Sequence, residues 1–390
     1  MRHRKLIIVF IVLLAYFSCE REGTPTVRVK FPSAKRIPFT FDTTRSFTIQ
    51  SGHFPALTGI GKIDKLPNGD YAILGGPVST LYWANSFGML QRLIATTGEG
   101  PTGFPLITDF CVAKSGQIFT ISDNPVQIGV FDSEGRFLRR YNLPWIAGES
   151  IRECKDGFVI GAMVVYDPSK GTTRSEPLNY GERRFILRYD SLFSRPIPML
   201  RPSPELSHTD GLYLLPYRKF APFAIAPRGE YLWAITQEGF YRIEEFDTEG
   251  RHLGRLEVES SHFVPVKPDA MVDFRKVGYD QAMHGKLIAS HSAPDLFLVG
   301  RNVAIIRMNM PYGNYYPQYR REAMPEYYYD LFLIQSGRLT PLYEGFKTGL
   351  WLVGVERNSD TFYFTKLEFQ AHEISPPRIY VVTIVPDVTK

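Results

Sequence analysis

Motifs that would identify an enzyme or a cofactor site are missing from this 390-residue sequence. It has no glycine-rich loop that would cradle phosphates before a helix, no cysteine pair spaced as metal ligands and no Gly-x-Ser-x-Gly turn. A membrane-spanning length of apolar sequence is also missing at the N-terminus. The run Leu6–Phe17 has 12 residues, whereas a transmembrane helix needs about 20. These absences exclude a phosphate loop, a cysteine-ligated metal centre and a serine-hydrolase elbow.

Turn-forming residues are abundant instead. The sequence has 32 Gly and 29 Pro, about one residue in six, which favours many short elements over long helices. Hydrophobic residues make up 44% and charged residues 22%, which is typical of a globular chain and not of a disordered one. The composition therefore argues against a helical bundle, a coiled coil and a polytopic membrane protein.

The N-terminus has the layout of a secretory signal. The basic residues Arg2, Arg4 and Lys5 precede the apolar run, which ends at Ser18-Cys19. A small residue followed by cysteine resembles the lipobox of bacterial lipoproteins, and this resemblance implies acylation of Cys19. We therefore predict a signal peptide over residues 1–18, a lipid-anchored tether over 19–35, and a membrane-anchored location in the bacterial envelope, facing the periplasm or the cell surface. The alternative is an ordinary signal peptide with an incidental cysteine.

Removal of the signal peptide changes the charge balance. The formal net charge of +5 falls to +2, because residues 1–18 contain three basic side chains and no acidic ones. No basic tail remains, so nucleic acid is not a predicted partner. Two further cysteines, Cys111 and Cys154, lie in apolar strand-like contexts. An oxidising compartment permits a disulfide between them, and two buried free thiols are the alternative.

Two classes of turn recur along the chain and divide it into repeated units. One class follows an apolar run and the other an amphipathic run. Their spacing indicates six units of four strands between about residue 59 and the C-terminus. Repeated four-stranded sheets are typical of a β-propeller, because one such sheet cannot bury both its faces alone. The first class comprises Asn68-Gly69, Ser115-Gly116, Asp156-Gly157, Arg228-Gly229, Arg301-Asn302 and Ser359-Asp360; the second comprises Phe87-Gly88, Glu134-Gly135, Asp190–Ser194, Glu249-Gly250 and Ser336-Gly337.

The second unit carries a family resemblance. It begins GEGPTGFP at Gly98–Pro105 and contains DSEGRFL at Asp132–Leu138, and the fourth unit repeats the latter as FDTEGRHL at Phe246–Leu253. These segments resemble NHL repeats and the six-bladed propeller lipoproteins of the NHL-like and TolB-like superfamily. The resemblance implies an all-β fold, a six-bladed β-propeller of four-stranded antiparallel blades over residues 36–390. It implies no function.

Long connections are predicted to emerge on one face of the propeller. Three join second to third strands and two join one blade to the next, and both kinds of connection leave a propeller on the same face. Insertions in repeat folds tend to cluster on the binding face. The alternative is that these segments only pack over the channel. They are Tyr166–Glu182, Asn309–Glu326, Leu367–Arg378, Arg201–Ala221 and Glu259–Asp295.

These connections contain the predicted ligand-binding residues. Tyrosine offers an apolar face with a polar tip, which suits glycans and peptides, and histidine can bind a metal or transfer a proton. We therefore predict a lipid-anchored envelope protein with a binding or scaffold function, whose partner on this face is a protein, a peptide or a glycan. The candidates are Tyr312, Tyr315, Tyr316, Tyr319, Arg320, Arg321, His208, His284 and His291.

An enzymatic function is the alternative. Some propellers of the NHL type are metal-dependent lyases, and related six-bladed propellers are calcium-dependent lactonases, so the resemblance admits a metal-dependent hydrolase or lyase with its site on the central axis. No ligand motif of either family can be matched residue by residue. The sequence therefore assigns no metal, no cofactor and no catalytic residue.

Ring closure is the last expectation from the sequence. The sixth unit ends with a third strand near Ile379–Val385, and only five residues follow it, too few for an outer strand. Strand-like sequence is available upstream of the first unit, at Arg36–Gln50. We predict that this N-terminal segment pairs with Ile379–Val385 as the outer strand of blade six.

Overall fold

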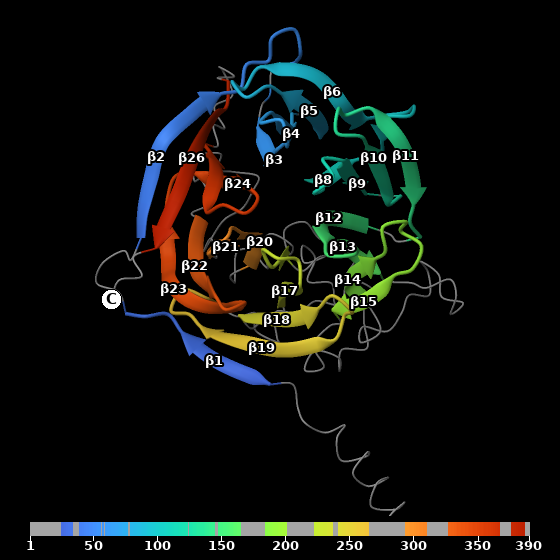
Figure 1. The fold of residues 1–390 in the computed structure, drawn as a ribbon. Coiled ribbons are helices and arrows are strands. Elements are labelled where there is room, and N and C mark those ends of the chain that lie inside the picture. Colours follow the sequence, from blue (N-terminus) through green and yellow to red (C-terminus); the bar gives the residue numbers. More distant parts are fainter. Residues whose placement is uncertain are drawn as a thin grey trace, which may run out of the picture.

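The computed structural model is built from strands around a central channel (Figure 1). Within the part of the chain that it describes there are 26 strands and no helix, and so no helix long and apolar enough to cross a membrane. The described residues are 25–33, 39–55, 57, 59–76, 79–123, 125–144, 147–164, 184–200, 222–236, 241–264, 293–309, 327–366 and 376–386.

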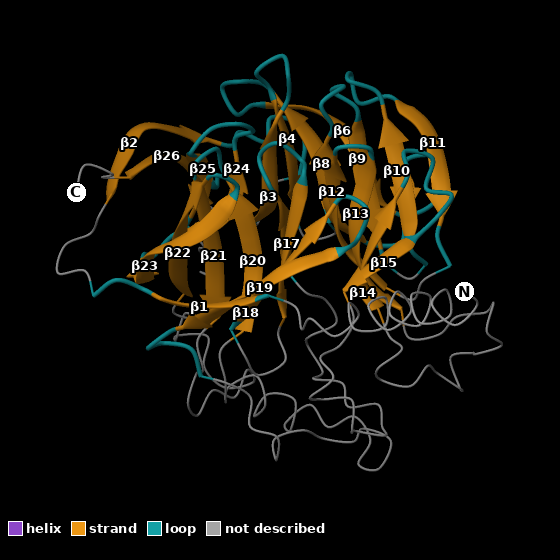
Figure 2. Ribbon diagram, turned by 60° about the horizontal axis from the view of Figure 1, so that its bottom comes forward, coloured by secondary structure: helices purple, strands orange, loops and turns teal. Residues whose placement is uncertain are grey.

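Six sheets form the blades, and the four main strands of each blade are antiparallel to their neighbours, which confirms the predicted fold class (Figures 1 and 2). The first strands are β3 (Ile60–Lys65), β8 (Ile107–Val112), β12 (Ala147–Cys154), β16 (Phe223–Ile225), β20 (Ala293–Val299) and β24 (Trp351–Val355). The second strands are β4 (Tyr71–Gly75), β9 (Ile118–Ser122), β13 (Gly157–Val164), β17 (Tyr231–Thr236), β21 (Val303–Asn309) and β25 (Thr361–Thr365). The third strands are β5 (Thr80–Ala84), β10 (Gln127–Phe131), β14 (Arg184–Tyr189), β18 (Arg242–Asp247), β22 (Tyr327–Gln335) and β26 (Arg378–Pro386). The outer strands are β6 (Leu90–Thr97), β11 (Phe137–Asn142), β15 (Ile197–Leu200), β19 (His252–Glu259), β23 (Arg338–Lys347) and β2 (Phe39–Thr48), and the short β7 (Gly103–Phe104) pairs parallel to β6.

The repeated turns of the sequence have a common geometry. In four blades an Asp or Asn side chain accepts backbone N–H groups two and four residues later, which fixes the turn between the third and the outer strand. In blade two, Asp132 Oδ1 accepts from the N–H groups of Glu134 and Arg136, each at 2.9 Å, and Gly135 has a φ of 75°. The same arrangement recurs at Asn85, Asp190 and Asp247.

Apolar side chains fill each of the six interfaces between neighbouring blades. The buried residues fall into six clusters, one for each interface. Cys111 belongs to the cluster between blades two and three, and Cys154 to the one between blades three and four. Both thiols are free and buried, so the disulfide alternative is wrong, because the two residues pack in different interfaces.

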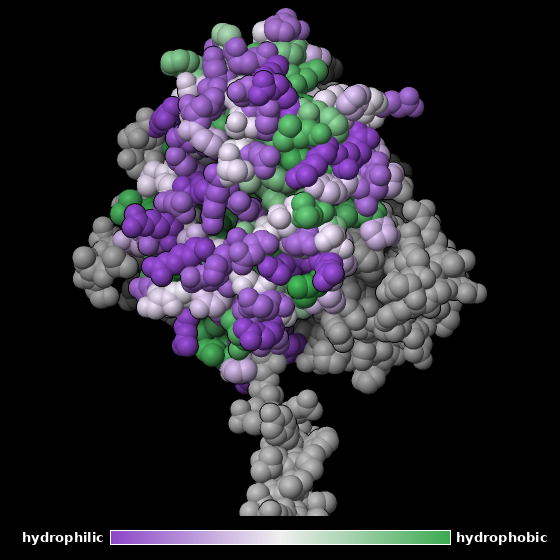
Figure 3. Space-filling view, turned by 45° about the vertical axis from the view of Figure 1, so that its right-hand side comes forward, coloured by the Kyte–Doolittle hydropathy of each residue, from purple (hydrophilic) through white to green (hydrophobic). Residues whose placement is uncertain are grey.

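The outer strands form the rim of the disc. Figure 3 shows small hydrophobic islands among hydrophilic residues on the side that carries β6 and β11. Leu93 of β6 and Leu138 of β11 are about half exposed, at 48% and 49%. Isolated apolar residues of this kind are normal on a protein surface.

The ring is closed by the N-terminal segment, as predicted. Strand β2 pairs antiparallel with β26, with Phe39 opposite Pro386 and Thr48 opposite Arg378. The pairing continues through Ile49, whose N–H donates to Pro377 O at 2.9 Å. Blade six therefore takes three strands from one end of the chain and its outer strand from the other (Figure 1).

The C-terminal half of the predicted tether is part of the propeller, which corrects the predicted range 19–35. Strand β1 (Thr26–Lys30) pairs parallel to β19 and becomes a fifth strand of blade four. Arg28 Nε lies 3.1 Å from Glu257 Oε2, and Phe31 is buried between blades four and five. Without β1, the backbone N–H and C=O groups at the outer edge of β19 would be unpaired, and pairing with β1 satisfies them.

Candidate functional site

A chain of charges links the first strands of three neighbouring blades beside the central channel. Lys62 Nζ of β3 donates to Asp109 Oδ1 of β8 at 2.9 Å and to Phe110 O. Asp109 Oδ2 accepts from Arg152 Nη1 of β12 and, at 3.0 Å, from the N–H of Ile151. We call Lys62, Asp109 and Arg152 the charge brace.

The brace is held in a poorly hydrated position. The side chains of Asp109, Lys62 and Arg152 are 8%, 12% and 20% exposed. Burial alone would raise the pKa of Asp109, but the positive charges of Arg152 and Lys62 outweigh burial, and the pKa of Asp109 lies below its usual value. Asp109 is therefore a carboxylate that serves two cations, and its removal leaves both of them without their shared partner.

The brace divides the channel into two cavities. One, of about 180 Å³, lies where the first strands turn into the second strands and is lined by residues such as Lys65, Lys114 and Asn358. We call this end the tight-turn mouth. The other cavity, of about 260 Å³, lies at the beginnings of the first strands and is lined by Gly61 and Thr108 among others. Lys62 and Arg152 border both cavities.

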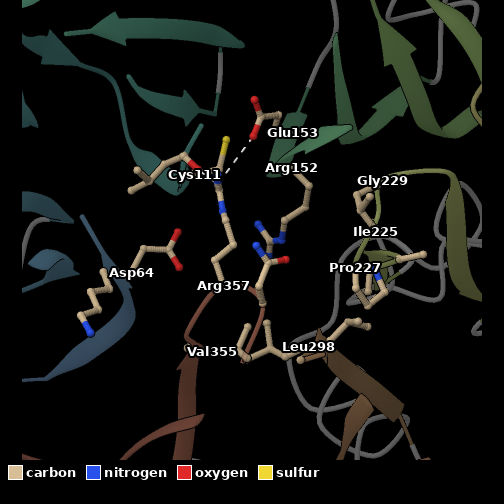
Figure 4. A pocket seen from close by; sticks show the side chains of 18 of the residues that line it. Asp64, Cys111, Arg152, Glu153, Ile225, Pro227, Gly229, Leu298, Val355 and Arg357 are labelled. Carbon is tan, nitrogen blue, oxygen red and sulfur yellow. Dashed lines mark hydrogen bonds and ion pairs between the residues drawn. The ribbon is translucent and has the colours of Figure 1, made fainter. Parts of the chain in front are cut away.

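Charged side chains from four blades line the cavity at the tight-turn mouth, and several of them are seen in Figure 4. Arg357, which follows β24, donates through Nη2 to Val112 O and lies 3.6 Å from Glu153 Oε2. Asp64 Oδ2 lies 3.8 Å from Lys62 Nζ, and burial raises the pKa of Asp64 above its usual value. The cavity therefore holds carboxylate and guanidinium groups from opposite sides of the ring.

Cys111 also lines this cavity, but its thiol is not activated. Burial raises the pKa of the Cys111 thiol to about 12, so it stays protonated near neutral pH. A protonated thiol is a poor nucleophile and a poor metal ligand.

The cavity at the other end of the channel has both apolar and polar walls. Phe223, Leu296 and Val353 line it together with Thr108, whose Oγ1 donates to Gly148 O of the next blade at 2.9 Å. Asp295, at its edge, is held by Arg307, which donates from Nε at 2.7 Å and from Nη2 at 3.0 Å. This cavity is on the face where the long connections begin and end.

The described residues provide no obvious cluster of metal ligands. Across the ranges that the structure covers, no group of three or more His, Cys, Asp or Glu side chains lies close enough to hold a metal ion. The predicted alternative of a metal-dependent enzyme therefore gains no candidate centre in this part of the chain.

The predicted binding residues lie outside the described residues, so their positions remain predictions. The strands that flank them are described, and they place both ends of each connection on one face. The second-to-third connections run from β13 to β14, from β21 to β22 and from β25 to β26. The blade-to-blade connections run from β15 to β16 and from β19 to β20. Strand order thus confirms that both ends of each long connection lie on one face.

The sequence predicted neither the brace nor the polar cavity beside it. The signal that could have revealed them is a charge inside an apolar strand, as in ITDFCV around Asp109 and SIREC around Arg152. A buried charge of this kind requires a partner. The partners lie on other blades, so local sequence could not name them.

Comparison with known proteins supports the propeller fold. No family model and no curated protein matches the chain. Among solved structures, a protein from Bacteroides fragilis that is described as exported is 15% identical, with a TM-score of 0.61 over 92% of this chain and 99% of that one. A member of the DUF4221 family from Bacteroides vulgatus is 11% identical, with a TM-score of 0.62 over 90% of this chain and all of that one. At such identities the likeness shows a shared propeller fold.

Proposed function

We propose that this protein is a lipid-anchored binding protein of the bacterial envelope, and that its partner docks on the face that carries the long connections. The observation that carries the proposal is the strand order, by which five long connections begin and end on that face. The opposite face has short turns fixed by Asx hydrogen bonds, such as the one at Asp132. The long connections are thus attached to one face of the propeller, where they can contact a partner.

The channel geometry supports the choice of face. Lys62, Asp109 and Arg152 of the charge brace line the cavity of about 260 Å³ on this side of the channel, so fixed charges are present there. The connection between β21 and β22 contains four tyrosines and an arginine pair, the residue types enriched where proteins bind peptides and glycans. A protein, a peptide or a glycan is the partner that such a surface fits best.

Replacement of the tyrosines tests the binding face. In a variant with Tyr312, Tyr315, Tyr316 and Tyr319 changed to Ser, we expect capture of the partner from solubilised envelope to fall by about tenfold or more, since aromatic anchors dominate interface energetics. The melting temperature should stay near that of the unmodified protein. Phe87→Ser is the matched control, because Phe87 is 80% exposed in a turn on the opposite face. Unchanged capture by the tyrosine variant, or equal loss in the control, would contradict the proposal.

The lipid anchor has its own test. Cys19→Ala should move the protein from the membrane pellet to the soluble fraction and abolish incorporation of labelled palmitate, because no acceptor thiol remains at the end of the signal peptide. Glu20→Gln, which keeps the cysteine, should leave both unchanged. A Cys19→Ala protein that still sediments with membranes would refute the anchor.

A further inference from the structure

We propose that the cavity at the tight-turn mouth of the channel binds a small carboxylate with a short apolar body. This site is on the opposite face from the proposed partner and does not depend on it. The argument rests on unused donors, an apolar wall, the size of the cavity and the balance of charge.

Two guanidinium groups have donors to offer. Each guanidinium carries five N–H groups in a planar fork that matches a carboxylate. Arg152 uses Nη1 for Asp109 and for Ile151 O, and Arg357 uses Nη2 for Val112 O. Their remaining N–H groups make no hydrogen bond within the described part of the chain. Both residues line the cavity, where a ligand oxygen could accept from them (Figure 4).

The opposite wall of the cavity is apolar. Blades four and five contribute Ala226, Pro227 and Leu298, and blade six contributes Val355. Figure 4 labels Pro227, Leu298 and Val355. Leu298 is 6% exposed and Ala226 is 5% exposed, so these side chains are buried in the body of the propeller. A ligand with an anionic head and a short hydrocarbon body would contact the guanidinium groups with one end and this wall with the other.

Size restricts the ligand further. The cavity holds about 180 Å³, and an engineered cavity of about 150 Å³ in another protein takes up benzene. Butyrate has as many non-hydrogen atoms as benzene, so acids of this length are the right scale. Larger acids would have to project from the mouth.

The charge balance favours an anion. Lys62, Lys65, Lys114, Arg152 and Arg357 line the cavity, against the carboxylates of Asp64 and Glu153. When Asp109 and Glu356, which pair with Lys62 and Lys65, are included, the cluster still carries one more positive than negative charge. The negative charge of Asp64 opposes binding of an anion in the cavity. Asp64 Oδ2 lies 3.8 Å from Lys62 Nζ, and the carboxylate makes no hydrogen bond among the described residues.

Calorimetric titration with sodium butyrate tests the site, with butanol and butylamine as neutral and cationic probes of the same length. We expect butyrate to bind one to one at millimolar concentration or below, and the two controls to bind at least tenfold more weakly, since butanol carries no charge and butylammonium has no acceptor. Absence of butyrate binding to the folded protein, or equal binding of butanol, would overturn the proposal.

Two variants with opposite expected effects on butyrate affinity locate the site. Arg357→Gln should weaken butyrate binding by about tenfold through loss of charge-assisted donors. Asp64→Asn should strengthen it several-fold by removing the opposing charge. Arg136→Gln is the control, because Arg136 is an exposed arginine paired with Asp132 in a surface turn of blade two. Loss of binding in Asp64→Asn, or unchanged binding in Arg357→Gln with both proteins folded, would place butyrate elsewhere and refute the assignment.

Discussion

A chain that begins at Ser51 should melt about 10 °C or more below the unmodified protein and should exchange the amide protons of β26 rapidly. Deletion to this point removes β1 and β2 and exposes the edge of β26 along its pairing from Arg378 to Pro386. It also removes Ile49 and Phe31, which are 0% and 5% exposed. Each buried side chain of this size contributes about 1.5–3 kcal/mol, and lost strand pairing adds to that. Thermal melts and hydrogen exchange measure the effect.

A shorter deletion separates the two strands. A chain that begins at Ser33 loses β1 but keeps β2, so it should melt much closer to the unmodified protein and keep β26 protected. Equal loss in the two deletions would show that β1, and not ring closure, accounts for the effect. A chain starting at Ser51 that melts like the unmodified protein would contradict the role of β2 altogether.

Asp109→Ala should destabilise the fold by about 3–5 kcal/mol, because it leaves Lys62 and Arg152 charged in the channel without their shared carboxylate. Lys62 and Arg152 are 12% and 20% exposed, so water replaces the lost partner poorly. Denaturant unfolding at neutral pH measures the change. Glu134→Ala is the matched control: Glu134 pairs with Arg136 at 2.9 Å, but both side chains are more than half exposed, so the expected loss is about 0–1 kcal/mol.

The pH dependence and a compensating variant sharpen this test. The pKa of Asp109 is lowered in the folded protein, so its contribution is complete above the usual carboxyl pKa and is lost as the pH falls through the lowered value. The difference between the Asp109→Ala protein and the unmodified one should therefore shrink in acid. Adding Lys62→Met and Arg152→Met to Asp109→Ala should recover much of the loss, since the three substituted positions then carry no unpaired charge. A triple variant no better than the single one would show that the geometry of the brace matters more than its charges.

Sequence alone determined the elements that local chemistry encodes. The turns at Asp132 and Asp247 are visible because a side chain, two backbone N–H groups and a glycine occupy five consecutive residues. Their spacing gave six blades, and the missing last strand after Val385 required a substitute, which the strand-like Arg36–Gln50 supplied. The crowding of long connections on one face followed from strand order in the same way.

Tertiary structure alone decided which distant residues meet. Lys62 and Asp109 are 47 residues apart, and Asp109 and Arg152 are 43 apart, so no local pattern indicates that they pair between neighbouring blades. The placement of β1 on blade four likewise depended on an open edge at β19, more than 220 residues away. Local periodicity fixes strands and turns because their hydrogen bonds are short in sequence, whereas the brace and its cavities arise only when the ring has closed.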